Sequence, residues 1–154
     1  MTSAGRLICG IDPGQSGGIA FIDTAPSHSY MAYPMPDTER DVFELLDEHA
    51  ASIEVAIIEA VHSMPKQGVA SSFKFGMSYG FLRGILIALR IPFKEISPQK
   101  WTKTLGLVGG APGTGKKNKH KAAAQQWFPH VKLTHATADA LLIAEAGRRL
   151  RVCP

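Results

Sequence analysis

The chain has 154 residues, a formal net charge of +4 and 45% hydrophobic residues. This composition is typical of a folded domain and excludes a disordered chain, and the length fits one domain spanning residues 1–154. No apolar run reaches the ~18–20 residues of a membrane span, and residues 1–10 lack a signal-peptide layout. The two cysteines, Cys9 and Cys153, do not indicate a disulfide framework, so we expect a reducing cytoplasm.

The charge is distributed unevenly along the sequence. Residues 1–59 contain 2 basic and 10 acidic residues, whereas residues 60–135 contain 12 basic residues and a single acidic one, Glu95. Such a basic segment suits a polyanion, because Lys and Arg displace counterions from phosphates. A solvated basic surface balanced by the acidic first part is the alternative interpretation.

Apolar periodicity and turn residues predict the elements in chain order. The expected strands are 6–12, 19–23, 29–35, 54–61 and 92–97. The expected helices are 37–51 with Asp37 as its cap, 71–90, 98–105, 118–128 and 137–150, with a Gly-rich loop at 106–117. Pro34 places the third strand at an edge or at an end. This order predicts a mixed α/β sheet with helices on its faces.

Three acidic residues interrupt apolar segments. Asp12 follows LICGI, Glu59 lies inside AIIEAV, and Asp139 lies in ATADALLIA. Charged residues are rarely buried without a reason, and carboxylates from three elements could converge at the strand ends. Their oxygens are suitable ligands for a divalent metal, and two such ions can act together on a phosphodiester. Each acid alone could instead be a strand-end or cap residue.

Several segments resemble a known family in both content and order. GIDPGQSGGIAFID resembles the first hairpin of RuvC-type Holliday junction resolvases, and AIIEAVHSMPKQGVASSFKFGMSYG resembles their second acid strand, loop and glycine-bearing dimer helix. FKEISPQKWTKTLGL and AAAQQWFP resemble the phage and organellar branch, and THATADALLIAEAG resembles the final acidic helix. The similarity spans nearly the whole chain.

The resemblance implies an RNase H-like fold, a mixed five-stranded sheet flanked by helices. It implies a Mg²⁺-dependent endodeoxyribonuclease that resolves four-way DNA junctions by symmetric hydrolysis, leaving a 5′-phosphate and a 3′-hydroxyl. Asp12, Glu59 and Asp139 would hold two Mg²⁺ or Mn²⁺ ions. In many relatives an acid or a His precedes the last ligand by three or four residues, so His135 is the candidate fourth ligand, or else a surface histidine.

Two symmetric cuts need two active sites. We therefore expect a homodimer formed through the 71–90 helix, whose two-fold axis would match the near-two-fold symmetry of a junction. No membrane partner is expected. The resemblance suggests the cytoplasm of a bacterial or phage-infected cell, or an organelle matrix.

The expected DNA contacts are mostly lysines. Bacterial relatives often carry an aromatic residue three positions after the second acid, and this chain has His62 there. A lysine cluster near a predicted helix start could bind phosphate at the scissile bond or could be solvated, and Trp101 is expected to pack in the core. The candidate DNA contacts are His62, Lys66, Lys100, Lys103, Lys116, Lys117, Lys119 and Lys121.

The segment Gly110–Lys116 matches the phosphate-binding pattern GxxxxGK. The next residue is Lys117 rather than Ser or Thr, no convincing strand precedes the segment, and only 38 residues follow Lys116. We therefore expect no nucleotide cofactor. Besides this NTPase reading, three alternatives stay open. They are a nuclease of the same fold acting on other branched or RNA-containing substrates, a non-catalytic DNA-binding module, and an actin-like phosphate hairpin.

Overall fold

The computed structural model describes residues 6–26, 28–60, 66–109 and 114–150. Its strands are β1 (Leu7–Asp12), β2 (Gly18–Asp23), β3 (Tyr30–Pro34), β4 (Ile53–Glu59) and β5 (Phe93–Ile96). Its helices are α1 (Glu39–His49), a 3₁₀ turn η1 (Ala50–Ser52), α2 (Val69–Ala88), α3 (Pro98–Thr104), α4 (Thr114–Trp127) and α5 (His135–Arg149). The described helices include none that is long and apolar enough to cross a membrane.

The five strands form one mixed sheet in the order β3-β2-β1-β4-β5. Strands β1, β2 and β3 pair antiparallel, whereas β1, β4 and β5 pair parallel. The five expected strands and the mixed α/β sheet are thus confirmed, and β3 lies at an edge, where Pro34 is its last residue.

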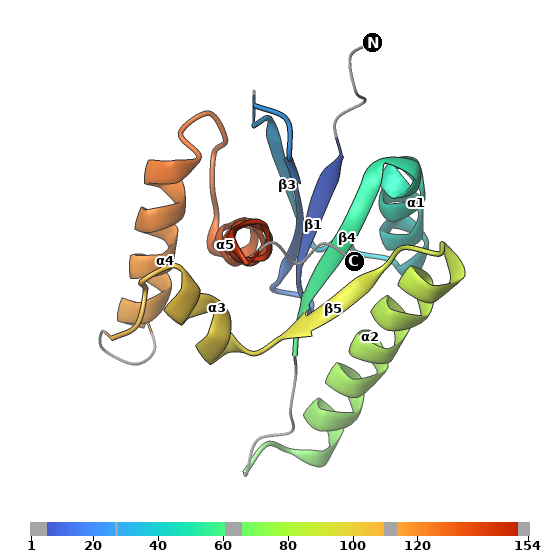
Figure 1. The fold of residues 1–154 in the computed structure, drawn as a ribbon. Helices are drawn as coiled ribbons and strands as arrows, with labels where there is room; N and C mark the ends of the chain where they lie inside the picture. Colours follow the sequence, from blue (N-terminus) through green and yellow to red (C-terminus); the bar gives the residue numbers. More distant parts are fainter. Residues whose placement is uncertain (1–5, 27, 61–65, 110–113, 151–154) are drawn as a thin grey trace.

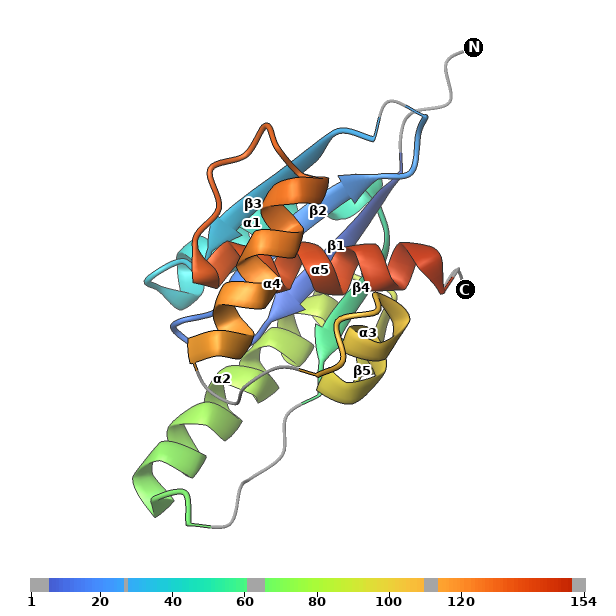
Figure 2. The ribbon, with the colours of Figure 1, turned by 90° about the vertical axis from the view of Figure 1, so that its left-hand side faces the viewer.

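Helices cover both faces of the sheet (Figures 1 and 2). Helices α1 and α2 lie on one face, where their buried side chains meet alternate residues of the strands, such as Ile11 and Ile58. Helices α3, α4 and α5 lie on the other face, against residues such as Ile8 and Ile57. Because side chains alternate along a strand, the face occupied by each strand residue follows from this division.

Several expected helix boundaries were wrong. Thr38 rather than Asp37 caps α1, and its side chain accepts a hydrogen bond from the backbone of Asp41. Helix α2 begins at Val69 rather than 71, and α5 begins at His135 rather than 137. Helix α4 begins at Thr114, so the end of the expected 106–117 loop is helical.

Two glycines let α5 rest directly on the sheet. A Cβ atom on Gly10 of β1 would lie 2.6 Å from the backbone nitrogen of Ala144 and would overlap the carbonyl oxygen of Ala140. A Cβ atom on Gly18 of β2 would overlap the carbonyl oxygen of Ala136. Because the two glycines have no side chain and the facing residues of α5 are alanines, α5 and with it Asp139 lie close to the backbones of β1 and β2.

We expect the substitution Gly10→Ala to lower the free energy of unfolding by about 3 kcal/mol, because the added methyl meets backbone atoms that cannot rotate away. Urea denaturation measures this change. In the single chain, the same substitution at Gly84 on helix α2, where an added Cβ meets nothing within 4 Å, should raise stability by about 0.5–1 kcal/mol. A Gly10→Ala protein as stable as the wild type would show that α5 does not depend on this close contact.

Candidate active site

Asp12 and Glu59 end two adjacent parallel strands. Asp12 is the last residue of β1 and Glu59 the last of β4, so both lie at the same edge of the sheet. Asp12 shares its strand face with Ile8 and Glu59 shares its face with Ile57, and both of these apolar residues pack against the α3–α5 layer. Both carboxylates therefore belong to the side covered by α5.

Asp139 lies in the second turn of α5 and completes the acidic group. Burial, together with the charges of Glu59 and Asp139, raises the pKa of Asp12 to about 8, although the charge of Lys117 acts to lower it. Within the described residues the Asp12 carboxylate makes no hydrogen bond or ion pair. The charges of Glu59 and Asp139 are thus close enough to Asp12 to disfavour its charged form.

Glu59 is held by the indole of Trp101. Trp101 Nε1 donates a hydrogen bond to Glu59 Oε2 over 2.6 Å. Burial nevertheless raises the pKa of Glu59, with Asp139 adding to the effect, whereas the Trp101 hydrogen bond, Lys116 and His120 act to lower it. Trp101 is only 2% exposed, which confirms that it packs in the core. Its additional contact with an acid was not foreseen.

His120 is the site residue that the sequence analysis missed. It lies on α4 with 3% of its surface exposed, and its Nδ1 is 3.0 Å from Asp139 Oδ1. Its ring also meets Trp101 edge to face, with 5.0 Å between centroids. The spacing of His120, Ala124 and Phe128, all buried, is a helical stripe that could have placed His120 on the inner face of α4.

The donor set suits a hard divalent cation. Carboxylate oxygens are the ligands that Mg²⁺ and Mn²⁺ favour, and a cation would relieve the repulsion that raises the pKa of Asp12. In the part of the chain that the structure describes, no three His, Cys, Asp or Glu side chains are already grouped tightly enough to hold a metal. The acids therefore fit a metal in chemistry and charge, without forming a closed ligand cage.

His135, the candidate fourth ligand, is the first residue of α5 and is exposed. It precedes Asp139 by four residues and so shares a side of the helix with it. Within the described residues His135 makes no hydrogen bond or ion pair with Asp12, Glu59 or Asp139. Its role as a ligand stays a prediction.

The lysine cluster divides over the faces of α4. Lys116 and Lys117 lie one turn before His120, and their charges act on Glu59 and Asp12 respectively. Lys119 Nζ donates to the carbonyl oxygen of Gly109 over 2.9 Å, and Lys121 is half-buried. All four lysines thus lie on α4, including Lys116 and Lys117 from the expected loop, and the charges of these two act on the acids.

The other candidate DNA contacts lie around the site. Lys100 and Lys103 are exposed on α3, on either side of Trp101 in the sequence. Lys103 and Lys116 line a common recess of about 470 Å³ between α3 and the start of α4. Lys66 is exposed just before α2, and His62 lies outside the described residues.

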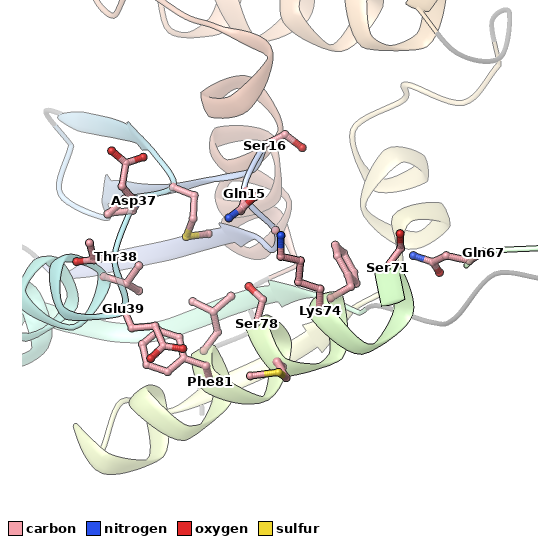
Figure 3. A pocket seen from close by; sticks show the side chains of 17 residues that line it. Gln15, Ser16, Asp37, Thr38, Glu39, Gln67, Ser71, Lys74, Ser78 and Phe81 are labelled. Atoms are coloured by element: carbon pink, nitrogen blue, oxygen red, sulfur yellow. The ribbon is translucent and has the colours of Figure 1, made fainter. Parts of the chain in front are cut away.

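A second hollow lies on the opposite side of the sheet. A groove of about 590 Å³ runs between the first half of α2, the β1–β2 turn and the β3–α1 connection (Figure 3). Gln15, Ser16, Ser71 and Lys74 are among its polar lining residues, but the three acids do not line it. The candidate active site is therefore the acidic edge beneath α4 and α5 rather than this groove.

The segment resembling a nucleotide-binding loop lies in an unsuitable context. Helix α3 and residues 105–109 precede it, rather than a strand. Its residues 110–113 lie outside the described part of the chain. In the P-loop arrangement a buried strand leads into the glycine-rich turn, so this context does not favour that interpretation.

The sequence matches no protein-family model and no curated protein, so the comparison depends on solved structures. RuvC of Thermus thermophilus in complex with a Holliday junction substrate has a TM-score of 0.63 at 13% identity, over 95% of this chain and 95% of that one. Another structure of this RuvC has a TM-score of 0.56 at 13% identity, over 96% and 98%. The fowlpox virus Holliday junction resolvase has a TM-score of 0.49 at 18% identity, over 94% and 99%. The two RuvC structures show that this chain has the fold of RuvC-type resolvases, the RNase H-like architecture that its motifs predicted.

Proposed function

We propose that this protein is a metal-dependent endonuclease that resolves four-way DNA junctions by symmetric phosphodiester hydrolysis. The observation that supports this most is the convergence of Asp12, Glu59 and Asp139 at one edge of a RuvC-type sheet, where burial and mutual repulsion raise the pKa of Asp12 to about 8. Three partly buried acids at one place destabilise the folded protein unless they bind a cation.

Asp12, Glu59 and Asp139 would hold the metal, with His135 as a possible addition to the set. Mg²⁺ or Mn²⁺, two ions per site, would supply the Lewis acidity for phosphodiester hydrolysis. The chain itself provides the carboxylate oxygens and, from α4, the positive charges of Lys116 and Lys117 next to them. These lysines are suited to binding the phosphates on either side of the cut.

The proposed DNA surface extends from this edge over α3 and α4. Lys103 and Lys116 line the same recess, and Pro98, Leu107 and Val108 form apolar parts of its wall. Lys100, Lys119 and Lys121 lie on the same two helices, and Lys66 and His62 would add contacts beside α2. Contacts of this kind are mostly to phosphate, so binding should weaken steeply as salt increases.

Helix α2 carries the surface proposed for homodimerisation. Four apolar side chains on its outer side are exposed, namely Val69 (88%), Phe73 (70%), Met77 (57%) and Ile87 (64%). Gly76, Gly80 and Gly84 lie among them, and a Cβ added to any of the three would meet nothing within 4 Å. Since exposed apolar stripes of this kind mark interaction sites, this stripe supports pairing with a second copy.

The deciding experiment offers the protein an immobile four-way junction and a linear duplex of matching sequence, each with Mg²⁺ or Mn²⁺. Paired symmetric nicks in the junction alone are expected, and Asp139→Asn should abolish them. Asp47→Asn, a matched change on the exposed side of α1, should leave cleavage intact. Binding without cleavage would instead support a non-catalytic DNA-binding module, and preferential cleavage of a flap or an RNA/DNA hybrid would indicate a different substrate.

A further inference from the structure

Trp101 reaches Glu59 from a firmly anchored helix. The Ser97 side chain accepts a hydrogen bond from the Lys100 backbone and so caps α3, and Thr102 Oγ1 donates to the carbonyl oxygen of Pro98. The indole is almost fully buried, so its N–H has a fixed direction. The bond of 2.6 Å to Glu59 Oε2 joins residues 42 positions apart in the sequence.

His120 does for Asp139 what Trp101 does for Glu59. Its Nδ1 lies 3.0 Å from Asp139 Oδ1, and a carboxylate can only accept, so Nδ1 carries the proton of this bond. Its Nε2 is buried and has no hydrogen-bond partner among the described residues. The bond to Asp139 is therefore the one hydrogen bond that fixes the direction of this ring among the described residues.

The two aromatic residues also contact each other. The rings of Trp101 and His120 meet at an interplanar angle of 61°, with their centroids 5.0 Å apart. Edge-to-face contacts of this kind are favourable beyond simple burial. A movement of either ring would therefore disturb the other, and through it the second carboxylate.

We propose that Trp101 and His120 are positioning residues, each of which orients one carboxylate of the metal site with a single hydrogen bond. This inference depends on the proposed function. Trp101 contacts only Oε2 of Glu59 and His120 only Oδ1 of Asp139, so in the described hydrogen bonds the second oxygen of each carboxylate stays available. Each bond therefore fixes the direction of its carboxylate while leaving an oxygen that can bind a metal, as the outer partners of metal ligands do.

The test uses Trp101→Phe, which keeps an aromatic ring but loses the N–H donor. The chain has two tryptophans, so Trp127→Phe is a matched control. Trp127 lies against Arg149, with 4.8 Å from the guanidinium carbon to the ring centroid, and makes no contact with the acids among the described residues. Mn²⁺ binding is measured by calorimetry in the absence of DNA, and junction affinity is measured in EDTA.

Trp101→Phe should raise the Mn²⁺ dissociation constant by about 10- to 100-fold, the usual effect of losing a bond to a metal ligand. Junction affinity in EDTA should not change, and Trp127→Phe should alter neither value. An unchanged Mn²⁺ dissociation constant in Trp101→Phe, together with a lower melting temperature, would overturn the proposal and leave Trp101 with a packing role only.

A second pair of variants keeps the test valid if Trp101→Phe folds poorly. His120→Leu should weaken Mn²⁺ binding to a similar extent, and His120→Asn should recover most of it, because its amide nitrogen can take the place of Nδ1. His130→Asn, an exposed histidine after α4, is the control. Equal Mn²⁺ binding by the Leu and Asn variants would contradict the positioning role. Normal Mn²⁺ binding by a wild-type protein that cuts no DNA would overturn the proposed function and leave this inference standing.

Discussion

Replacing Asp12 by Asn is expected to abolish junction cleavage, by at least ~10³-fold, and to stabilise the metal-free protein at pH 8. Burial, together with the charges of Glu59 and Asp139, raises the pKa of Asp12 to about 8, whereas an unfolded Asp titrates near pH ~4. Between these pH values the folded protein keeps a proton that the unfolded chain has released. The wild-type free energy of unfolding therefore falls by roughly 1 kcal/mol per pH unit as the pH rises through this window.

Thermal melts in EDTA at pH 5 and pH 8 measure this effect. The melting temperature of Asp12→Asn minus that of the wild type should increase by roughly 5–10 °C between the two pH values. Millimolar Mn²⁺ should raise the wild-type melting temperature at pH 8 and leave that of the variant nearly unchanged. Asp47→Asn serves as the control, since it alters an exposed carboxylate on α1. If the difference in melting temperature between Asp12→Asn and the wild type is the same at pH 5 and pH 8, the folded protein does not raise the pKa of Asp12.

The sequence predicted a feature best where a short run of neighbouring residues was enough to identify it. Apolar runs bounded by turn residues placed all five strands, and each of the three acids stood out because it interrupts an apolar segment. Helix boundaries were harder to predict where two neighbouring residues are both suitable as the N-cap. Asp37 and Thr38 are both good caps, and only the backbone of Asp41 shows that Thr38 is used.

The α4 error has a different origin. Residues 106–117 are rich in glycine, so they were expected to form a loop and the helix was expected to begin only at residue 118, whereas α4 begins at Thr114. His120 lies among four lysines in the sequence and was not chosen as a site residue, although it is buried against Asp139. The bond from Trp101 to Glu59 was also beyond local reasoning, because only the parallel packing of β4 and β5 brings the start of α3 to the end of β4.

The substitution Phe73→Glu on helix α2 is expected to convert a dimer into a monomer. The wild type should sediment at micromolar concentration with twice the chain mass of 16.6 kDa. In a two-fold interface the substitution introduces two like charges at once and removes an aromatic side chain, so the dimer dissociation constant should rise by about 100-fold. Because Phe73 is 70% exposed in the single chain, the melting temperature of the monomer should hardly change.

Phe43→Glu is the matched control, since Phe43 is also exposed, at 41%, but lies on α1 away from the stripe. This variant should stay dimeric. On a four-way junction Phe73→Glu should produce single, unpaired nicks, because its acidic site is intact while the second site is no longer held nearby. A Phe73→Glu protein that stays dimeric would move the interface away from the outer side of α2. A monomer that still makes paired cuts at the wild-type rate would show that one site serves both strands in turn.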